Sequence, residues 1–304
     1  MAQRWTRLIR FTAVETGGKR VHLGQPVDPK VDVGLAVLKK HSLQANEISA
    51  ESALDPQAKV TDRILTVDTL LEPIAPEEVG IVRCLGLNYR DHAAEAKMAI
   101  PEVPVLFYKP YTSLIPTLAP IRIPPAAQPV HEHLSDYEVE LAIVIGKDAK
   151  DVPESKALDY VLGYTGANDI SFRKHQLATS QWSFSKSFDN TTPLGPALIS
   201  PSLLPSQSPQ SLSLTCSVNS QVLQNGTTAD QIFTVARTIA FLSQGTTLRA
   251  GSVIITGTPA GVGFVKEPKV WLRDGDEVRT FVGGGIGTLV NKIVEEKAEL
   301  KSRL

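Results

Sequence analysis

The sequence of 304 residues is poor in cysteine: Cys84 and Cys216 lie far apart, each within an apolar stretch. We therefore expect two buried, reduced thiols. The sequence contains no Cys-x-x-Cys pair and no cluster of histidine with cysteine, which excludes the usual spacing of a zinc site. No apolar run approaches the roughly 20 residues that a membrane span requires, so no membrane partner is expected.

An excess of charge of either sign is also missing, because 31 basic and 32 acidic side chains leave a formal net charge of −1. Without a basic excess, the chain is not expected to bind nucleic acid. The glycine-rich segment GTPAGVG (residues 257–263) lacks the Lys-Ser/Thr of a phosphate-binding loop and does not fit the dinucleotide pattern GxGxxG. A nucleotide-dependent enzyme is therefore disfavoured.

The beginning of the chain is basic, since Arg4, Arg7 and Arg10 precede the first acidic residue, Glu15. Such a segment is typical of a mitochondrial transit peptide. The same run, RWTRLIRFTAV, is also typical of a strand that begins a domain, and no long serine-rich amphipathic helix follows it. We therefore expect a cytoplasmic protein, with a mitochondrial location as the alternative.

The pattern of the chain changes near Ile81. The part before it carries two short strand-like runs and one helix candidate, at residues 8–14, 20–23 and 32–40. A segment rich in proline and acidic residues, 71–80, is typical of a boundary. From Ile81 onward, β-branched apolar runs alternate with Gly and Pro turns. We predict a mixed, β-rich α+β fold, with a small N-terminal α+β domain and a larger strand-dominated domain, over residues 1–75 and 76–304.

Three helices are predicted in the larger part. The first begins near Asp91, a plausible N-cap for an alanine-rich segment. The second covers SFRKHQLATS, residues 171–180. The third covers residues 228–243, where Thr228 and Gln231 stand at capping-box spacing and a glycine follows the end.

The most informative strand is DYEVELAIVIG, residues 136–146. Side chains alternate between the faces of a strand, so Glu138 and Glu140 point the same way, about 7 Å apart. Two carboxylates on one face repel each other unless a cation or protons lie between them. On this spacing alone, an exposed strand end with two solvated glutamates remains the better interpretation.

A third carboxylate, Asp169, ends the next strand-like run, VLGYTGAND. Aspartate is disfavoured inside strands but expected where they end. With Glu138 and Glu140 it would form a facial set of oxygen ligands that leaves positions open for a substrate. Ligands that offer only oxygen suit a hard cation such as Mg²⁺, Mn²⁺ or Ca²⁺.

Seven motifs follow in order between Gly86 and Val278: GLNYRDHAAE, VLFYKP, DYEVELAIVIGK, GYTGANDIS, WSFSKSFD with PLGPAL, IITGTPAGVG and LRDGDEV. Together they resemble those of the fumarylacetoacetate hydrolase superfamily. The small N-terminal part and the run SFDNTTPLGPALIS are similar to its two-domain members, the relatives of oxaloacetate tautomerases. The resemblance implies a β-roll catalytic domain, usually a homodimer, with a bound Mg²⁺ or Mn²⁺.

The resemblance also implies roles for single residues. Its metal ligands fall on Glu138, Glu140 and Asp169. Its catalytic positions, a His–Glu pair on a lid helix and an active-site lysine, fall on His92, Glu95 and Lys186. Its substrate-binding positions fall on Lys109, Arg173, Gln176 and Thr258.

The chemistry of the catalytic positions agrees with these roles. His92 and Glu95 stand at i and i+3 on one helix face, where a carboxylate orients an imidazole and raises its basicity for general-base catalysis. Without the resemblance, such a pair is more often surface decoration. In WSFSKSF, strand alternation places Lys186 on the face of Phe184 and Phe188, where a partly desolvated ammonium can stabilise an oxyanion. A lysine on an edge strand is the alternative.

Arg173 and Gln176 share the i, i+3 geometry, so Arg173 would clamp a substrate carboxylate while Gln176 donates to a carbonyl oxygen. An exposed polar helix face is the alternative. Two departures from the family pattern, Lys174 after Arg173 and a long loop PVHEHLSD, leave the choice of substrate open.

The function expected from this set is metal-dependent hydrolysis of a C–C bond in a β-diketo or 2-oxo acid, such as an acylpyruvate or fumarylpyruvate. A metal-stabilised enolate would form, and His92 with Glu95 would activate water. Decarboxylation or tautomerisation of oxaloacetate shares that intermediate and is the alternative. A binding homologue without activity is a further alternative, which the intact set of residues disfavours.

Overall fold

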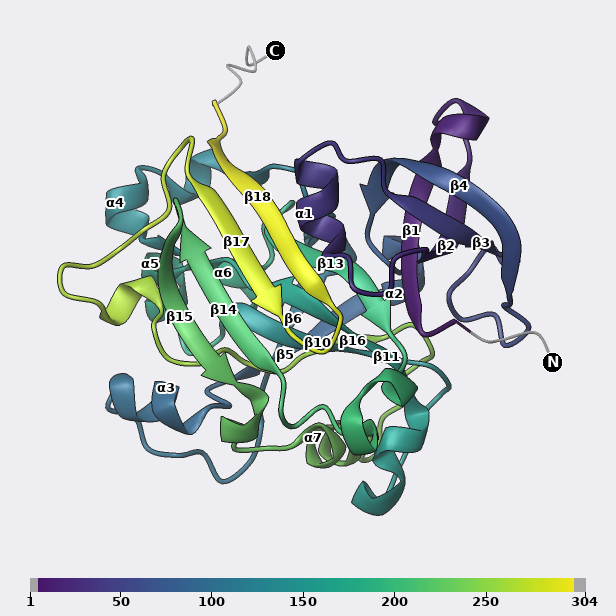
Figure 1. Cartoon of the computed structure of the whole chain (residues 1–304). Helices are drawn as coiled ribbons and strands as arrows, with labels where there is room; N and C mark the ends of the chain where they lie inside the picture. Colours follow the sequence, from purple (N-terminus) through teal and green to yellow (C-terminus); the bar gives the residue numbers. More distant parts are fainter. Residues whose placement is uncertain (1–4, 298–304) are drawn as a thin grey trace, which may run out of the picture.

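The computed structural model describes residues 5–297, so Arg4 of the basic start lies outside the described residues. The fold is β-rich with few, short helices (Figure 1). In spatial order, the large sheet consists of β2 (Val21–Pro26), β3 (Gln44–Ile48), β4 (Val60–Leu71), β1 (Arg7–Ala13), β13 (Thr192–Ile199), β11 (Val161–Asn168), β10 (Val139–Ile145), β16 (Val253–Ile255), β5 (Ile81–Gly86) and β6 (Val105–Pro110). Strand β7 (Leu114–Ile115) pairs with β13 beside this path.

A second sheet consists of β15 (Gln221–Thr227), β14 (Ser213–Val218), β17 (Glu277–Val282), β18 (Gly287–Glu295) and β8 (Ile121–Ile123). A separate pair is formed by β9 (Ser135–Asp136) and β12 (Ser171–Phe172). The helices are α1 (Val33–Leu38), α2 (Pro76–Val79), α3 (Arg90–Glu95), α4 (Val130–His133), α5 (Arg173–Leu177), α6 (Ser183–Lys186) and α7 (Val235–Leu242).

Strand β10 lies between β11 and β16 and is buried on both faces, as its run of apolar residues predicts. Leu141 and Ile143 belong to the core cluster that includes residues of β14 and β17 in the second sheet. Ala142 and Val144 belong to the cluster on the other face, with residues of β5 and β16. Alternation therefore places Glu140 on the face of Ala142, away from the second sheet.

The N-terminal strands β1, β2, β3 and β4 each pair with two neighbours in that order, so they close into a ring. The ring has its own apolar centre, which includes Phe11, Leu65 and Ala197. Strand β1 also pairs with β13 through Arg7 and Leu8, which joins the ring to the large sheet. The predicted boundary between residues 1–75 and 76–304 stays a prediction, because β1 and Ala197 connect both parts.

Helix α1 packs against β18 through Gly34. A Cβ atom at Gly34 would lie 1.7 Å from the carbonyl oxygen of Thr288, a backbone atom that cannot turn away. We expect Gly34→Ala to lower the free energy of unfolding by about 2–3 kcal/mol, since overpacking forces the helix and strand apart. A urea titration would report a lower midpoint, with Val37→Ala on the same helix as the comparison. An unchanged midpoint for Gly34→Ala would contradict this contact.

The structure corrects the starts of two predicted helices. Helix α3 begins at Arg90 after Tyr89, and Asp91 is not its N-cap. The predicted helix over residues 228–243 is shorter, because α7 starts after Thr234, which caps it; the Gln231 side chain instead donates to the Thr256 hydroxyl. No capping box forms.

The run WSFSKSF is not a strand. It contains the short helix α6, in which residues two apart lie on nearly opposite sides. Phe184 is accordingly 65 % exposed, whereas Lys186 is buried. The helix expected over residues 32–40 is confirmed as α1, with the Asp32 carboxylate accepting from the Leu35 backbone N–H.

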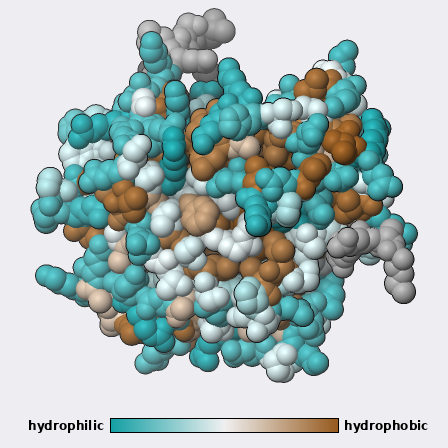
Figure 2. All heavy atoms as spheres, viewed as in Figure 1, coloured by the Kyte–Doolittle hydropathy of each residue, from teal (hydrophilic) through white to brown (hydrophobic). Residues whose placement is uncertain are grey.

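The burial of the two cysteines and the mostly hydrophilic surface agree with what the composition predicts. Cys84 and Cys216 are free and buried, as expected. The face shown in Figure 2 is mostly hydrophilic, with hydrophobic residues gathered in separate small groups. Among residues 5–297, no helix has both the length and the apolar character needed to cross a membrane.

Candidate active site

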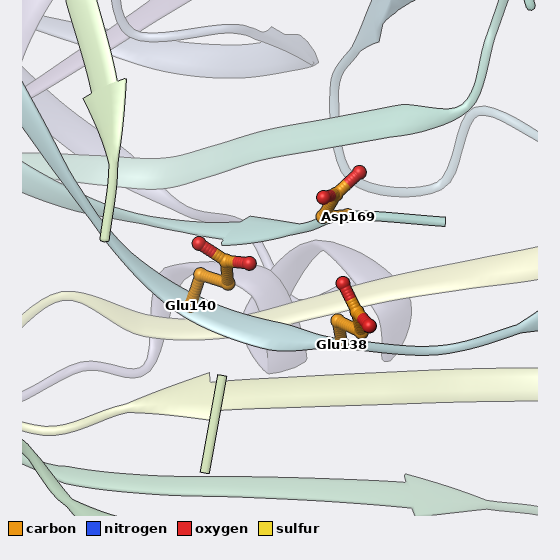
Figure 3. A group of neighbouring side chains, drawn as sticks. All are labelled: Glu138, Glu140 and Asp169. Carbon is orange, nitrogen blue, oxygen red and sulfur yellow. The ribbon is translucent and has the colours of Figure 1, made fainter. Parts of the chain in front are cut away.

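Three buried carboxylates meet at the ends of β10 and β11. Glu138 and Glu140 point from one strand toward Asp169, which follows the neighbouring strand (Figure 3). The Asp169 backbone N–H donates to the Glu138 carbonyl oxygen (2.9 Å), which fixes the two segments side by side. The three residues offer oxygen atoms that all lie within 4.8 Å of one another. The interpretation as solvated glutamates at an exposed strand end is therefore wrong.

Buried cations surround two of the three carboxylates. Lys109 on β6 donates to Oδ1 of Asp169 (2.7 Å). Lys186 on α6 donates to Oδ2 of Asp169 (2.7 Å) and to Oε2 of Glu138 (2.8 Å). Arg173 at the start of α5 places Nη2 at 2.7 Å from Oε1 of Glu138. The carboxylates of Asp169 and Glu138 are thus held in place by three positive groups.

These contacts lower the pKa of Glu138 and raise the pKa of Lys186. Burial acts to raise the pKa of Glu138, but Lys186 and Arg173 outweigh it and hold that pKa far below its ordinary value. Burial acts to lower the pKa of Lys186, but Asp169 and Glu138 raise it to about 12. Lys186 is therefore an ammonium at neutral pH, and Glu138 is ionised.

The pKa of Glu140 shifts in the direction opposite to that of Glu138. Burial and the neighbouring Asp169 and Glu138 raise its pKa well above the ordinary value. Within the described residues no basic side chain forms an ion pair with it, and its Oε2 accepts a hydrogen bond from the Gly257 backbone N–H (2.6 Å). A buried carboxylate without a positive partner, beside two further carboxylates, is a position that a divalent cation would stabilise.

The donor set fits such a cation. It offers only carboxylate oxygens, which suits a hard divalent ion. Each ionised oxygen has two lone-pair directions, so the lysine bonds to Asp169 leave room for a metal. Glu138, Glu140 and Asp169 are the residues that would hold it.

Asp136 is a member of this network that sequence reasoning missed. Its Oδ2 accepts from Arg173 Nε (2.9 Å) and from the Phe264 N–H (3.0 Å), while Oδ1 accepts from the Gly263 N–H (2.7 Å). A carboxylate at the start of a buried strand was the only sequence signal for it. Arg173 is consequently bound to Asp136 and Glu138, and its Nη1 donates to the Gln176 amide oxygen (2.9 Å). The guanidinium cannot offer Nε to a substrate.

We expect Asp136→Asn to lower the free energy of unfolding by about 3 kcal/mol, because it leaves Arg173 buried beside a neutral partner. Turnover should fall by about 10- to 100-fold, as for other losses of a supporting contact behind a site. Thermal unfolding and steady-state kinetics would measure the two effects. The exposed Asp159→Asn is the matched control, and equal behaviour of the two variants would refute the role of Asp136.

The predicted His–Glu pair lies on α3. His92 Nδ1 is 3.5 Å from Oε2 of Glu95, and both Glu95 oxygens accept from the Gly261 backbone N–H (2.9 and 3.1 Å). Partial burial acts to raise the pKa of Glu95, but the nearby His92 imidazole and the hydrogen bonds from Gly261 outweigh it and lower that pKa. The helix is thus connected to the GTPAGVG turn, with Glu95 as an anion behind the imidazole.

The same turn carries Thr258. Its hydroxyl donates to the Val139 carbonyl oxygen (2.9 Å) and accepts from the amide of Gln224 (2.7 Å). Thr258 can therefore only accept a further hydrogen bond, because its one proton is committed to Val139. Gln224 is a second positioning residue that sequence reasoning missed.

A cavity of about 230 Å³ brings most of the predicted residues together. Its lining includes His92, Glu138, Glu140, Arg173, Gln176, Lys186 and Thr258. The other three predicted residues are not part of that lining: Glu95 lies beside His92, Asp169 is bound to Lys186, and Lys109 is bound to Asp169. One concave site thus contains carboxylates for a cation, an imidazole and an ammonium.

Comparisons with known proteins agree with this arrangement. The family described as "Fumarylacetoacetate (FAA) hydrolase C-terminal" matches residues 81–294. The chain therefore belongs to the fumarylacetoacetate hydrolase family. It is an enzyme of that family, whose similar members include hydrolases, isomerases and tautomerases.

Two relatives illustrate the range of activities. The chain is 55 % identical over 294 residues to the caffeoylpyruvate hydrolase of Neonothopanus nambi, covering 96 % of this chain and 94 % of the relative. It is 36 % identical over 299 residues to the mitochondrial oxaloacetate tautomerase fahd2 of Xenopus laevis, covering 95 % and 90 %.

Solved structures show the same fold. The fumarylacetoacetate hydrolase of the psychrophilic Exiguobacterium antarcticum superimposes with a TM-score of 0.76 at 30 % identity, covering 96 % of this chain and 100 % of that one. The 5-carboxymethyl-2-hydroxymuconate delta-isomerase of Mycobacterium smegmatis does so with a TM-score of 0.76 at 33 % identity, covering 95 % and 100 %. The β-rich fold of the fumarylacetoacetate hydrolase type, which the resemblance predicted, is thereby confirmed.

Proposed function

We propose that this chain is an acylpyruvate hydrolase, which uses a divalent metal and water to cleave the C–C bond between the acyl group and pyruvate. The observation that carries the proposal is that His92 and the carboxylates Glu138 and Glu140 line one cavity. The relative from Neonothopanus nambi, named a caffeoylpyruvate hydrolase, supports this class of substrate.

The metal is proposed to be Mg²⁺ or Mn²⁺, held by Glu138, Glu140 and Asp169. A divalent cation at this position supplies Lewis-acid stabilisation of negative charge on the carbonyl oxygens of the substrate. Lys186 adds a fixed ammonium beside the same oxygens, since Glu138 and Asp169 hold it at the cavity wall.

The remaining residues bind and move protons. His92, with Glu95 behind it, removes a proton from water as the water oxygen adds to the distal acyl carbonyl. The C–C bond then breaks, a carboxylic acid leaves, and the pyruvate fragment takes up a proton at the carbon released. Gln176, whose carbonyl oxygen is occupied by Arg173, has its amide N–H groups available for the substrate carboxylate.

The test is to follow acetylpyruvate, fumarylpyruvate and oxaloacetate by proton NMR with Mg²⁺ and the wild-type chain. Cleavage of acetylpyruvate into acetate and pyruvate, abolished by EDTA and restored by metal, is the expected result. Tautomer exchange without any cleavage would sink the hydrolase proposal.

Oxaloacetate tautomerisation or decarboxylation is the second candidate. It uses the same carboxylates and Lys186 but needs no water, and the relative from Xenopus laevis supports it. In the NMR experiment it would appear as faster keto–enol exchange or loss of carbon dioxide from oxaloacetate. A binding homologue without activity is disfavoured, because Glu138, Glu140, His92 and Lys186 all line the cavity.

A homodimer is proposed as the working assembly. Strand β6 is the last strand of the large sheet, and its Val105, Leu106 and Tyr108 side chains are exposed, as are Met98 and Ile100 in the segment before it. An apolar edge strand of this kind favours a second copy as its partner. Light scattering during gel filtration would decide the assembly.

The cytoplasmic location and the separate N-terminal domain, residues 1–75, remain proposals as well.

A further inference from the structure

The cavity has an apolar side that the proposed chemistry does not use. Apart from the polar residues, its lining includes Leu85, Phe107, Trp182, Val262 and Phe264. Hydrolysis of the C–C bond needs only the carboxylates, the ammonium, the imidazole and water. An apolar wall beside them is therefore available to select the acyl group of the substrate.

The aromatic residues follow one another away from the proposed metal ligands. Lys186 Nζ, which binds Glu138 and Asp169, lies 5.1 Å from the ring centroid of Phe107. The Trp182 ring lies 5.7 Å from the Phe107 ring, edge to face at 66°. A substrate whose dicarbonyl part lies at the carboxylates would extend its acyl group along Phe107 to Trp182.

Gly86 provides the seat for Trp182. A Cβ atom at Gly86 would lie 2.3 Å from Cζ3 of the indole, so only glycine leaves room for this edge of the ring at the end of β5. The φ angle of Gly86 is not positive, so its backbone conformation does not itself require glycine. The absence of a side chain at Gly86 thus acts on the position of Trp182 alone.

We infer that Trp182, seated on Gly86 beside Phe107, binds a planar aromatic or conjugated acyl group and makes aryl-substituted acylpyruvates the preferred substrates. This inference rests on the proposed acylpyruvate hydrolysis. The methyl group of acetylpyruvate ends at the carbonyl that water attacks, whereas a phenyl or styryl group reaches the indole and stacks on it. A single methylene in an apolar pocket already changes kcat/KM by about 10-fold or more, so a ring should exceed that.

The experiment measures kcat and KM of the Mg²⁺-loaded protein for acetylpyruvate, benzoylpyruvate and cinnamoylpyruvate. The wild type should favour the two aromatic substrates by at least about 10-fold in kcat/KM. Trp182→Ala should remove this preference mainly by raising KM for the aromatic substrates, because binding common to ground and transition state is lost. Acetylpyruvate should change less than about threefold, and Trp182→Phe should restore part of the preference.

Gly86→Ala tests the seat without touching the carboxylates. It should push the indole into the cavity and lower kcat/KM for the aromatic substrates while sparing acetylpyruvate. Trp271→Ala, which removes a partly buried tryptophan outside the cavity lining, is the matched control and should leave the preference intact. If Trp182→Ala does not fold, the inference is tested by the ratio of kcat/KM for the aromatic substrates to kcat/KM for acetylpyruvate in Trp182→Phe and Gly86→Ala.

The outcomes separate this inference from the proposed function. Cleavage of acetylpyruvate and the aromatic substrates at equal kcat/KM would overturn the inference and leave the hydrolase proposal standing. An equal loss on all three substrates in Gly86→Ala and Trp182→Phe would overturn it too. Cleavage of none of them by the wild type would refute the proposed function, and the inference with it.

Discussion

Replacing Glu140 by glutamine is expected to abolish metal-dependent turnover while leaving the metal-free protein at least as stable as the wild type. Burial, with Asp169 and Glu138 nearby, raises the pKa of Glu140 well above its ordinary value. A raised pKa means that the carboxyl contributes stability below the unfolded pKa, and that this contribution is lost as pH rises toward the folded pKa. A glutamine amide has the same size but does not ionise, so the variant avoids this loss of stability. It also removes one of the three carboxylates that would hold the metal.

Thermal unfolding with EDTA and with Mg²⁺ would measure both effects. A ligand at 100 times its Kd stabilises by about 2.7 kcal/mol, so the wild type should show a metal-induced shift that Glu140→Gln lacks. Without metal, raising the pH from 5 to 8 should destabilise the wild type more than the variant.

Glu138→Gln is the informative comparison. Glu138 is bound to Lys186 and Arg173, so its loss leaves buried positive groups without a partner and should cost about 3–5 kcal/mol in the metal-free protein. Two glutamates on one strand are thus expected to behave oppositely. If Glu140→Gln proved as unstable as Glu138→Gln in EDTA, the assignment of Glu140 as the unpaired metal ligand would be wrong.

His92→Ala is expected to lower kcat for acylpyruvate cleavage by about 100- to 10,000-fold, the range for removal of a general base. The metal-induced shift in unfolding temperature should persist, because His92 is not among the carboxylates that would hold the cation. Tautomer exchange of oxaloacetate needs no attacking water and should be retained to a larger extent.

NMR of both reactions in the same samples would measure this contrast. His131→Ala, on the exposed face of α4, is the matched control and should match the wild type. Full cleavage activity in His92→Ala would contradict the general-base role of the pair. A parallel loss of cleavage and tautomer exchange would instead assign His92 to substrate binding.

The carboxylate cluster was predictable because its geometry is local. A period of two residues places Glu138 and Glu140 on one face, and a strand end is a favourable position for Asp169. The structure brings these three together, and antiparallel pairing of β10 with β11 sets the register. Without the family motifs, burial of that strand end could not be deduced, since nothing in the strand itself shows which residues cover it.

The features that the sequence did not predict depend on contacts with residues far away along the chain. Asp136 is bound to Arg173 and to the backbone of Gly263, which lie 37 and 127 residues further along the chain. The alternation in WSFSKSF predicts a strand for Lys186, yet its tertiary contacts with Glu138 and Asp169 are made from a helix of a single turn. Short segments of this kind take the conformation that their tertiary contacts stabilise, and local pattern does not reveal it.

The closed ring of β1 to β4 affects how the protein is made on the ribosome. All four strands have been synthesised once Leu71 is complete, but β13, the outside partner of β1, ends only at Ile199. Gly34 of α1 docks on Thr288, which is synthesised later still. At roughly 5–20 residues per second, the ring has to wait many seconds with the Arg7–Leu8 end of β1 unpaired and one face of α1 uncovered. The nascent chain is therefore expected to be most prone to aggregate, and most dependent on chaperones, before its last strands emerge.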